Sequence, residues 1–398
     1  KEDDNDTALL ESLRTASKDL QRNTNPIFFF ATYFSPTQYH SSIEALLPQA
    51  ETLLITPKLS KLVHLLSTLK TLLQNLKDSQ GYTIKSILRR QVISYQIYQA
   101  SFAIEAEIQR YIDHELVKKV VATLDGADSY TNEDKVSVLK ELEERLLQGF
   151  DREFQELILK GRVFYLLESL LCDPGCETKI RELAACGVLA LVKFNKDVFV
   201  GLVLMGPIVR ALISMATGSS VRVLCSMIKL VRTPLVDEME SGELIPRVVG
   251  LLGSRHVEVV AGGVVCVCEI AYVGRKEVVR ELLELGVVER LLELQRSSDG
   301  TQCQGRQQCN NVISVDSDRD EHEHEQGGDE EGSMVARRWP VFSGCVSRFA
   351  VQVEVGEGLS REERKEFKSE ILRRVREASV SQAETASIVA EVLWGSSP

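Results

Sequence analysis

The sequence has little of what a β-rich, secreted or membrane-spanning protein needs. Aromatic residues make up only 6% of its 398 residues, and tryptophan occurs twice. Leu, Val, Glu and Arg dominate instead, a usage that favours helices over a sheet sandwich. No apolar run approaches the roughly 18–20 residues that cross a bilayer, and the longest early run is only Ile27–Phe30. We therefore expect an all-α protein that does not engage a membrane.

Cysteine usage and the first residues indicate the compartment. The nine cysteines are an odd number, and several lie inside apolar stretches, as Cys186, Cys225 and Cys266 do. This pattern fits buried thiols in a reducing compartment better than a disulfide framework. The opening residues KEDDND offer no secretory signal, and a start at Lys rather than Met leads us to expect that the native N-terminus is missing. We expect a cytoplasmic and/or nuclear location.

The charge balance argues against nucleic acid as a partner. The formal net charge is −11, from 58 acidic and 47 basic residues, so a phosphate backbone would repel the chain. Nine of the acidic residues, however, fall between Asp316 and Glu331, which leaves the rest of the chain closer to neutral. The exclusion of nucleic acid therefore rests mainly on the absence of a basic ladder.

Recognisable catalytic motifs are also missing. The sequence has no P-loop, no G-x-S-x-G elbow, no H-E-x-x-H helix and no kinase motif. Cys172 and Cys176 flank a turn without a second pair at zinc-ribbon distance. Cys266 and Cys268 lie two positions apart on a helix, so their side chains diverge. We expect no catalytic residues, no metal site and no cofactor.

Residues 7–120 have the pattern of long amphipathic helices. In Lys58–Leu76 the leucines are alternately three and four residues apart, which is the spacing of an a/d row. This leucine row comprises Leu59, Leu62, Leu66, Leu69, Leu73 and Leu76. Thr83–Thr123 predicts one long partner helix, and Thr7–Leu20 and Ser41–Leu54 predict two more. A four-helix bundle over residues 1–123 is our interpretation, with an intermolecular coiled coil and self-association as the alternative.

Residues 133–296 contain an internal repeat in which a glycine precedes an apolar helix. The four glycines are separated by 45, 36 and 44 residues. They are Gly161, Gly206, Gly242 and Gly286. A shorter helix is expected before three of them, and a third helix, rich in small residues, between the units. A period near 40 residues indicates a helical solenoid of the HEAT or armadillo type.

This region resembles the armadillo-repeat family, whose unit is a short helix, a glycine, an apolar helix and a third helix. Glu277–Leu292 is the best match, and Leu183–Leu191 and Val260–Ala271 match the third helix. A helical bundle followed by repeats is also similar to the plant U-box/armadillo ubiquitin ligases. No U-box pattern occurs in this sequence, so that kinship implies a relative without the ligase module.

The resemblance also implies where a partner would bind. In nuclear-import armadillo proteins the third helices carry a Trp and an Asn four residues apart, which hold a basic peptide. Alignment by the alanine pair gives three pairs at these positions: Gly187/Leu191, Ile228/Arg232 and Val265/Glu269. None of them keeps Trp or Asn, so the resemblance implies a groove of small, apolar and mixed-charge residues rather than a nuclear-localisation site. We predict these six residues as the partner-binding positions.

The C-terminal part begins with a polar, low-complexity stretch. Its composition over residues 297–336 cannot bury enough apolar surface to offset ordering entropy, which predicts a disordered acidic loop. Two capping boxes, Ser360…Glu363 and Ser381…Glu384, then predict helices that end near Ala378 and Trp394. We expect residues 337–398 to form a terminal repeat that covers the end of the solenoid.

One short motif lies inside this acidic stretch. Val312, Ile313, Val315 and Asp316 belong to a short apolar strand pattern followed by acidic residues, which resembles a SUMO-interacting motif. Such a strand binds by adding to an exposed sheet edge. Seven-residue matches also arise by chance in acidic loops, so an inert linker is the alternative.

Taken together, these patterns predict a non-enzymatic scaffold or adaptor that binds protein partners through an armadillo groove. The alternative is a regulator or substrate adaptor of the ubiquitin pathway that lacks ligase activity. The identity of the partner is not encoded in any motif that we recognise.

Overall fold

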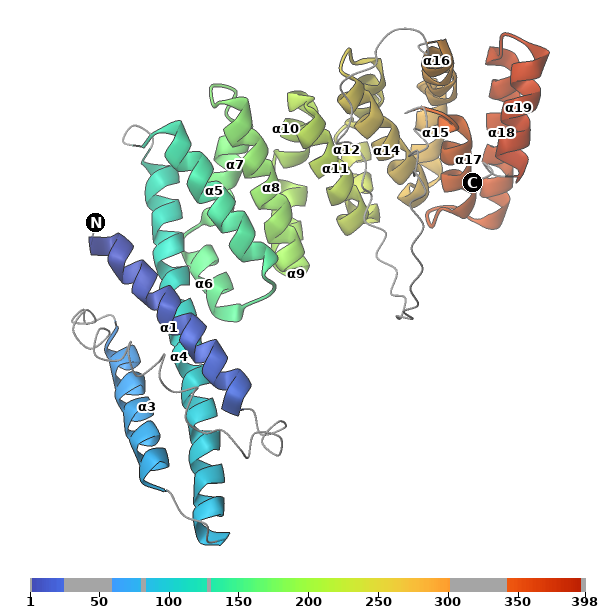
Figure 1. Ribbon diagram of the computed structural model, residues 1–398. Helices are drawn as coiled ribbons and strands as arrows, with labels where there is room; N and C mark the ends of the chain where they lie inside the picture. The colour runs from blue at the N-terminus through green and yellow to red at the C-terminus, as the bar shows by residue number, and fades with distance from the viewer. Residues whose placement is uncertain (1, 25–58, 80–83, 127–129, 301–341, 395–398) are drawn as a thin grey trace. The chain divides into compact units, whose positions relative to one another are not determined.

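The computed structural model describes residues 2–24, 59–79, 84–126, 130–300 and 342–394. Every regular element within these ranges is helical (Figure 1), which confirms the predicted all-α class. The chain divides into two compact units. The first comprises Lys1–Tyr130 and Phe150–Val163, and the second comprises Thr131–Gly149 and Phe164–Pro398.

The first unit is a set of helices packed on one long helix. Its helices are α1 (Glu2–Thr24), α3 (Ser60–Asp78), α4 (Ile84–Asp125) and α6 (Arg152–Lys160). Both α1 and α3 pack against α4. The leucine row is buried in this core, since Leu62 and Leu69 are fully inaccessible, so within this unit it is an intramolecular seam. The predicted helix Ser41–Leu54 lies outside the described residues, and the four-helix count stays a prediction.

Helix α4 has two buried segments. With 42 residues it extends about 63 Å. Its first half contributes Ile97 and Ile104 to the core with α1 and α3. Its second half packs against α6, and Gly161 directly after α6 permits this approach, because a Cβ there would lie 3.0 Å from Val117 Cγ1. Residues 150–163, which we predicted within the repeats, are grouped with the N-terminal helices by their contacts, and the domain boundary at residue 133 stays a prediction.

The second unit is a solenoid of three-helix repeats, which is the armadillo arrangement. Five helices occupy the third position of a repeat, and each packs against the next one. They are α5 (Asn132–Leu147), α8 (Thr178–Phe194), α11 (Gly218–Val231), α14 (Val257–Val273) and α17 (Cys345–Val355). The remaining helices are α7 (Val163–Cys172), α9 (Lys196–Met205), α10 (Ile208–Met215), α12 (Thr233–Ser241), α13 (Ile245–Gly250) with the 3-10 turn Leu251–Gly253, α15 (Lys276–Glu284), α16 (Val287–Gly300), α18 (Arg361–Ala378) and α19 (Gln382–Trp394).

The repeating glycines lie at the turns between first and second helices, as the sequence predicts. Gly206, Gly242 and Gly286 follow α9, α12 and α15. Gly286 has a φ of 72°, in the left-handed region where glycine costs least. In the repeat before it, Glu243 takes this conformation instead, with a φ of 54°. Arg162, directly after Gly161, is also left-handed, with a φ of 52°. The turn at Gly206 has no such residue, since Gly206 has a φ of −94°, so these turns share the glycine rather than one backbone conformation.

The C-terminal helices divide differently from the predicted boundary at residue 337. Helix α17 packs against both α14 and α16, so it is the third helix of the repeat that α15 and α16 begin. Residues 301–341 thus join two helices of one repeat. Helix α16 continues to Gly300, so residues 297–300, predicted as disordered, are helical.

Helices α18 and α19 follow α17 and pack against it. At the start of α18 the capping box is complete, because Ser360 accepts from the Glu363 amide while the Glu363 carboxylate accepts from the Ser360 amide. At α19 only half of the box forms. Ser381 caps the Glu384 amide, but the Glu384 carboxylate accepts from the Val380 amide at 2.7 Å.

Candidate functional site

The most extensive candidate site lies on the third helices of the second unit. Helices α8, α11, α14 and α17 each bury more than half of their residues and leave a row accessible at a spacing of mostly three or four, whereas α5 buries only five of its 16 residues. We call the combined rows the third-helix face. It comprises Glu143, Glu182, Cys186, Lys193, Arg222, Ser226, Lys229, Arg232, Val265, Glu269, Tyr272, Arg348 and Gln352.

Ion pairs connect the third helices across this face, both between neighbours and between the ends of α11 and α17. Lys229 on α11 lies 3.5 Å from Glu269 on α14. Arg232, directly after α11, pairs with Glu357 at 2.6 Å, and its guanidinium lies 5.7 Å from the centre of the Tyr272 ring. These side chains are partly exposed, so each pair contributes about 0–1 kcal/mol to stability. Their larger consequence is a surface on which both signs of charge alternate.

The α5–α8 end of the face is less well solvated. Burial raises the pKa of Glu143 above its usual range, and the nearby Lys193 partly offsets this. Burial also raises the pKa of the Cys186 thiol, with Glu143 and Glu182 adding to the effect. The Cys186 thiol is therefore neutral at physiological pH and a poor nucleophile.

The six residues predicted as partner-binding divide into two groups. Arg232, Val265 and Glu269 lie on the third-helix face. Gly187, Leu191 and Ile228 are buried and cannot contact a partner in the folded chain. A Cβ at residue 187 would lie 3.1 Å from Leu167 Cδ1, so this glycine serves packing within the unit.

The alanine pair used for the alignment sets the wrong register for α8 and α11. A third helix packs on its own repeat and on two neighbours, which leaves only a narrow accessible row. Arg222, Ser226 and Lys229 repeat at spacings of four and three, so the polar and charged residues indicate the accessible side of α11, which the alanines did not.

The residues of the proposed SUMO-interacting motif, Val312 to Asp316, lie outside the described residues.

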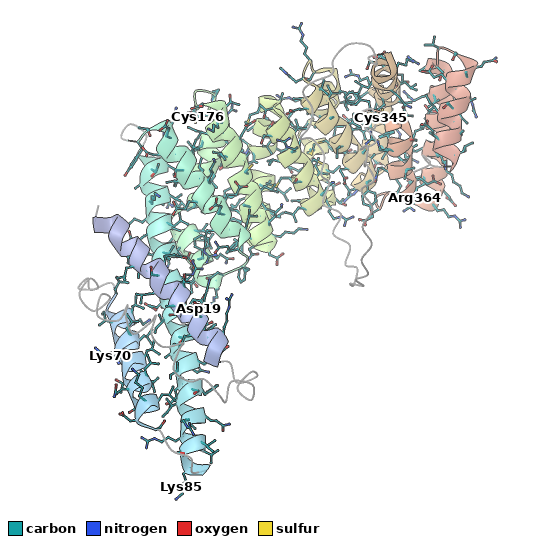
Figure 2. The ribbon with its side chains drawn as sticks, in the orientation of Figure 1. Asp19, Lys70, Lys85, Cys176, Cys345 and Arg364 are labelled. Carbon is teal, nitrogen blue, oxygen red and sulfur yellow. The ribbon has the colours of Figure 1, made fainter. Side chains whose placement is uncertain are left out.

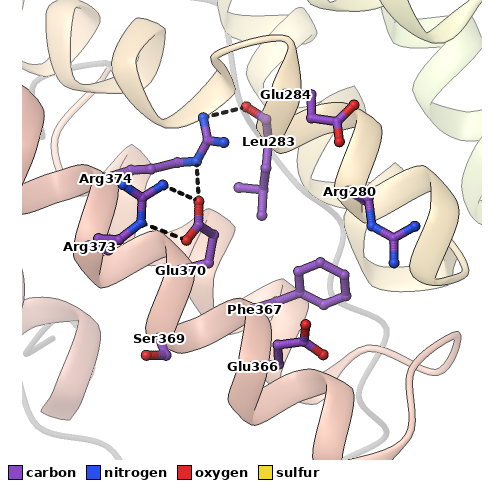
Figure 3. Close-up of a pocket in the computed structure, with 9 residues that line it drawn as sticks. All are labelled: Arg280, Leu283, Glu284, Glu366, Phe367, Ser369, Glu370, Arg373 and Arg374. Atoms are coloured by element: carbon purple, nitrogen blue, oxygen red, sulfur yellow. Dashed lines mark hydrogen bonds and ion pairs between the residues drawn. The ribbon is translucent and has the colours of Figure 1, made fainter.

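A second candidate is a surface cavity of about 510 Å³ between α15 and α18, shown in Figure 3. Three of its charged groups, Glu370, Arg373 and Arg374, are engaged with one another. Glu370 accepts hydrogen bonds from Arg373 and Arg374, at 2.6 and 2.8 Å, and Arg374 also donates to the Leu283 carbonyl at 2.7 Å. The hydrogen bond from Arg373 is the largest cause that lowers the pKa of Glu370 to about 2. This network fastens α18 to α15 and gives these three charged groups a structural role.

Buried thiols form the other chemical cluster of the second unit. Cys225 and Cys266 lie close together across the α11–α14 contact, and the interaction with Cys225 raises the pKa of Cys266, whose thiol donates to the Val221 carbonyl at 3.6 Å. Burial raises the pKa of Cys268 to about 12 and that of Cys345, at the start of α17 (Figure 2), to about 11. Across the described ranges, no group of three or more His, Cys, Asp or Glu side chains is placed to hold a metal ion.

The described helices were also compared with the requirements of a membrane span. No single one of them is long and apolar enough to cross a bilayer. Helices α9 and α10 together meet the length and composition requirement, but they bend by 70° at the break between them.

The chain is similar to known proteins in structure only. No protein-family model and no curated protein matches the chain. Two designed armadillo repeat proteins, one of them in complex with peptide (KR)4, each match 71% of this chain and 99% of their own, with 13% identity and a TM-score of 0.41. An engineered protein from a structural genomics consortium covers 98% of this chain and 88% of its own, with 14% identity and a TM-score of 0.42. None of these similarities assigns a role to a residue.

Proposed function

We propose that the protein is a non-enzymatic interaction scaffold that holds an extended protein segment along the third-helix face. One observation carries the proposal, namely that five third helices pack in succession and each adds accessible charged or polar residues to one face. Repeat proteins use such surfaces because every unit contributes to a single extended contact.

The dimensions suit a peptide rather than a small molecule. Neighbouring helices lie about 8–10 Å apart, so five third helices extend roughly 40 Å. An extended chain of about 12 residues has that length. The pairing of Lys229 with Glu269 and of Arg232 with Glu357 would then be exchanged in part for contacts to the bound segment.

The charges on the face favour a segment with acidic residues. Arg222 and Arg348 are exposed, and no carboxylate of the described residues lies within ion-pair distance of either. They belong to α11 and α17, which are two helix spacings apart, so acidic side chains about six residues apart would reach both. The accessible rows of α8, α11, α14 and α17 have no Asn, which argues against the nuclear-localisation mode of binding.

Selection of random linear peptides on the full chain tests this proposal. We expect enriched peptides to carry acidic residues, and Arg222→Glu to weaken their binding by about tenfold or more. Arg210→Glu on α10 is the matched control, because Arg210 is exposed but lies outside the face. Equal affinities for both variants would refute the proposal.

A charge exchange sharpens the same experiment. Lys229→Glu and Glu269→Lys each break the pair, whereas the double variant restores it with reversed polarity. If the face binds peptides, the double variant will keep its stability and lose its peptide preference. Unchanged peptide preference in the double variant would place the binding site elsewhere.

Regulation of the ubiquitin pathway is supported only by the order of helical bundle and repeats along the sequence. In that alternative the protein recruits a substrate or competes with U-box relatives. Incubation of the purified chain with a panel of E2 enzymes tests the non-enzymatic part of both proposals. Robust autoubiquitination would overturn it.

A further inference from the structure

Helix α4 of the first unit exposes an apolar row on the side away from its core. Leu88, Val92, Tyr95 and Phe102 are 56%, 58%, 52% and 61% accessible, although all four are large apolar side chains. With Gln99 and Ala106 they lie alternately four and three residues apart. We call this row the α4 seam: Leu88, Val92, Tyr95, Gln99, Phe102 and Ala106.

The seam lies opposite the helices that already pack on α4. Ile93, Ile97 and Ile104 point into the core with α1 and α3. At 100° per residue, the seam is centred roughly 180° around the helix from these isoleucines. Among the described residues, the helices packed on the core side therefore leave the seam uncovered, and the accessible fractions agree.

The spacing is that of a coiled-coil seam, and its residues complement a second copy that runs in the opposite direction. In antiparallel pairing Val92 lies opposite Phe102 of the second copy, and Leu88 lies opposite Ala106 of the second copy. Each of these pairs forms one layer of the interface, and in both layers a large side chain contacts a smaller one. In the central layer Tyr95 meets Gln99 of the second copy. These two residues already hydrogen-bond within one helix, from Gln99 Nε2 to Tyr95 Oη at 2.8 Å.

Charge at the two ends of the seam favours the same direction. Lys85, at the N-terminal end of α4 (Figure 2), and Arg89 and Arg90 give that end positive charge. At the other end the carboxylates are already paired within the unit, Glu105 with Lys18 at 3.5 Å and Glu107 with Arg110 at 2.9 Å. A parallel pair would set the basic ends of both copies side by side, whereas an antiparallel pair separates them by the length of the seam.

We propose that the α4 seam is a self-association surface, on which α4 of a second copy docks antiparallel. This inference is independent of the proposed function of the third-helix face. The four large side chains supply about 400 Å² of apolar surface per copy, given the size of such residues. Together with the polar residues beside the seam, the buried area of such a dimer is at the low end for a specific protein–protein interface. The dimer is therefore expected to be weak and to dissociate on dilution.

Sedimentation of the full chain at several concentrations tests the proposal. Wild-type protein should shift from the 44.5 kDa monomer toward twice that mass as concentration rises. A Val92→Glu/Phe102→Glu double variant should remain monomeric with an unchanged helical circular dichroism spectrum. Val380→Glu is the matched control, since Val380 is 80% accessible but belongs to the second unit, and it should dimerise like the wild type.

A mixing experiment tests the direction. Val92→Lys and Phe102→Glu should each weaken dimerisation by about tenfold or more. Mixed in equal amounts, they should form a heterodimer, because an antiparallel pair then has one Lys–Glu layer and one intact Val–Phe layer. A parallel pair would have no such layer, so the absence of rescue would overturn the antiparallel arrangement.

The remaining outcomes decide against self-association. Wild-type protein that stays monomeric at high concentration would overturn the proposal. If hydrogen exchange showed the seam protected in that monomer, another part of the chain would be the occupant. Dimers unaffected by the double variant would place self-association on another surface.

Discussion

The two units of the molecule differ in how they present apolar residues to solvent. Among the described residues of the first unit, four of the seven exposed large apolar residues form one row on α4, and Tyr130, Phe150 and Leu159 lie outside it. In the second unit they are dispersed over several helices, with Met205 on α9, Tyr165 on α7 and Val257 on α14 among them. Single exposed apolar residues are normal on a protein surface, whereas a row at heptad spacing indicates an interface. The comparison therefore supports our two proposals, which are self-association through the first unit and recognition of a partner segment by the charged face of the second.

The first unit also contains two apolar rows with nearly the same spacing and opposite burial. The leucine row of α3 is buried, whereas the α4 seam is exposed. Periodicity alone does not distinguish the two, because it shows that a helix has an apolar side but not what covers that side.

The largest expected effect is on the free energy of unfolding, which should respond differently to substitutions in these two rows. Leu66→Ala should lower the free energy of unfolding by about 2–5 kcal/mol, because Leu66 is 1% accessible and its loss leaves a cavity. Val92→Ala on the exposed seam should change it by no more than about 0.5 kcal/mol. Denaturant titration followed by circular dichroism measures both. Similar losses for the two variants would contradict the difference in burial.

The next largest effect concerns close backbone approach in the second unit. In Gly358→Ala the new Cβ would lie 2.0 Å from the Gly274 carbonyl oxygen, so we expect a loss of about 1–3 kcal/mol. Gly201→Ala, in the middle of α9, meets nothing within 4 Å and should stabilise by about 0.5–1 kcal/mol. Thermal unfolding of the two variants gives the comparison, and a stable Gly358→Ala protein would show that the backbones can separate there.

A smaller effect is expected on the rates at which thiols of the second unit are alkylated. Iodoacetamide at mildly alkaline pH should modify Cys172 and Cys176, which are partly accessible, at least about tenfold faster than Cys268. The pKa of Cys268 is raised from 9.0 to about 12 by burial, so folding favours its neutral form. The stability from this group is present below pH 9 and falls as the pH rises toward 12. Peptide-resolved mass spectrometry checks the rates, and equal rates would contradict the burial.

The smallest expected effect is that of Glu370 on acid stability. Its pKa is lowered to about 2, chiefly by the hydrogen bond from Arg373, so its contribution is present above its ordinary pKa of 4.5 and is lost as the pH falls toward 2. Because solvent screens this site, Glu370→Gln should cost less than about 1 kcal/mol near neutrality. The difference between wild type and variant should shrink below pH 4.5. A difference that grows in acid would contradict the assigned pKa.

Sequence patterns predicted the helices and the repeat unit well, because apolar periodicity and glycine turns are local properties. The ends of α18 and α19 and the short helices before the glycines were all identified in this way. The register of the third-helix face was not, since Leu191 and Ile228 are as apolar as their exposed neighbour Val265 and only packing distinguishes them. The place of α17 in its repeat was also missed, because 44 residues, 301–344, separate it in sequence from α16.

The most direct test of the central claim is to map where a selected peptide binds. A photo-reactive residue placed at the centre of the peptide would be cross-linked to the full chain, and the modified residues identified by mass spectrometry. The account predicts cross-links on α8, α11 and α14, at or next to residues of the third-helix face, and their loss in the Arg222→Glu variant. Cross-links confined to the first and second helices of the repeats, or to the first unit, would contradict it.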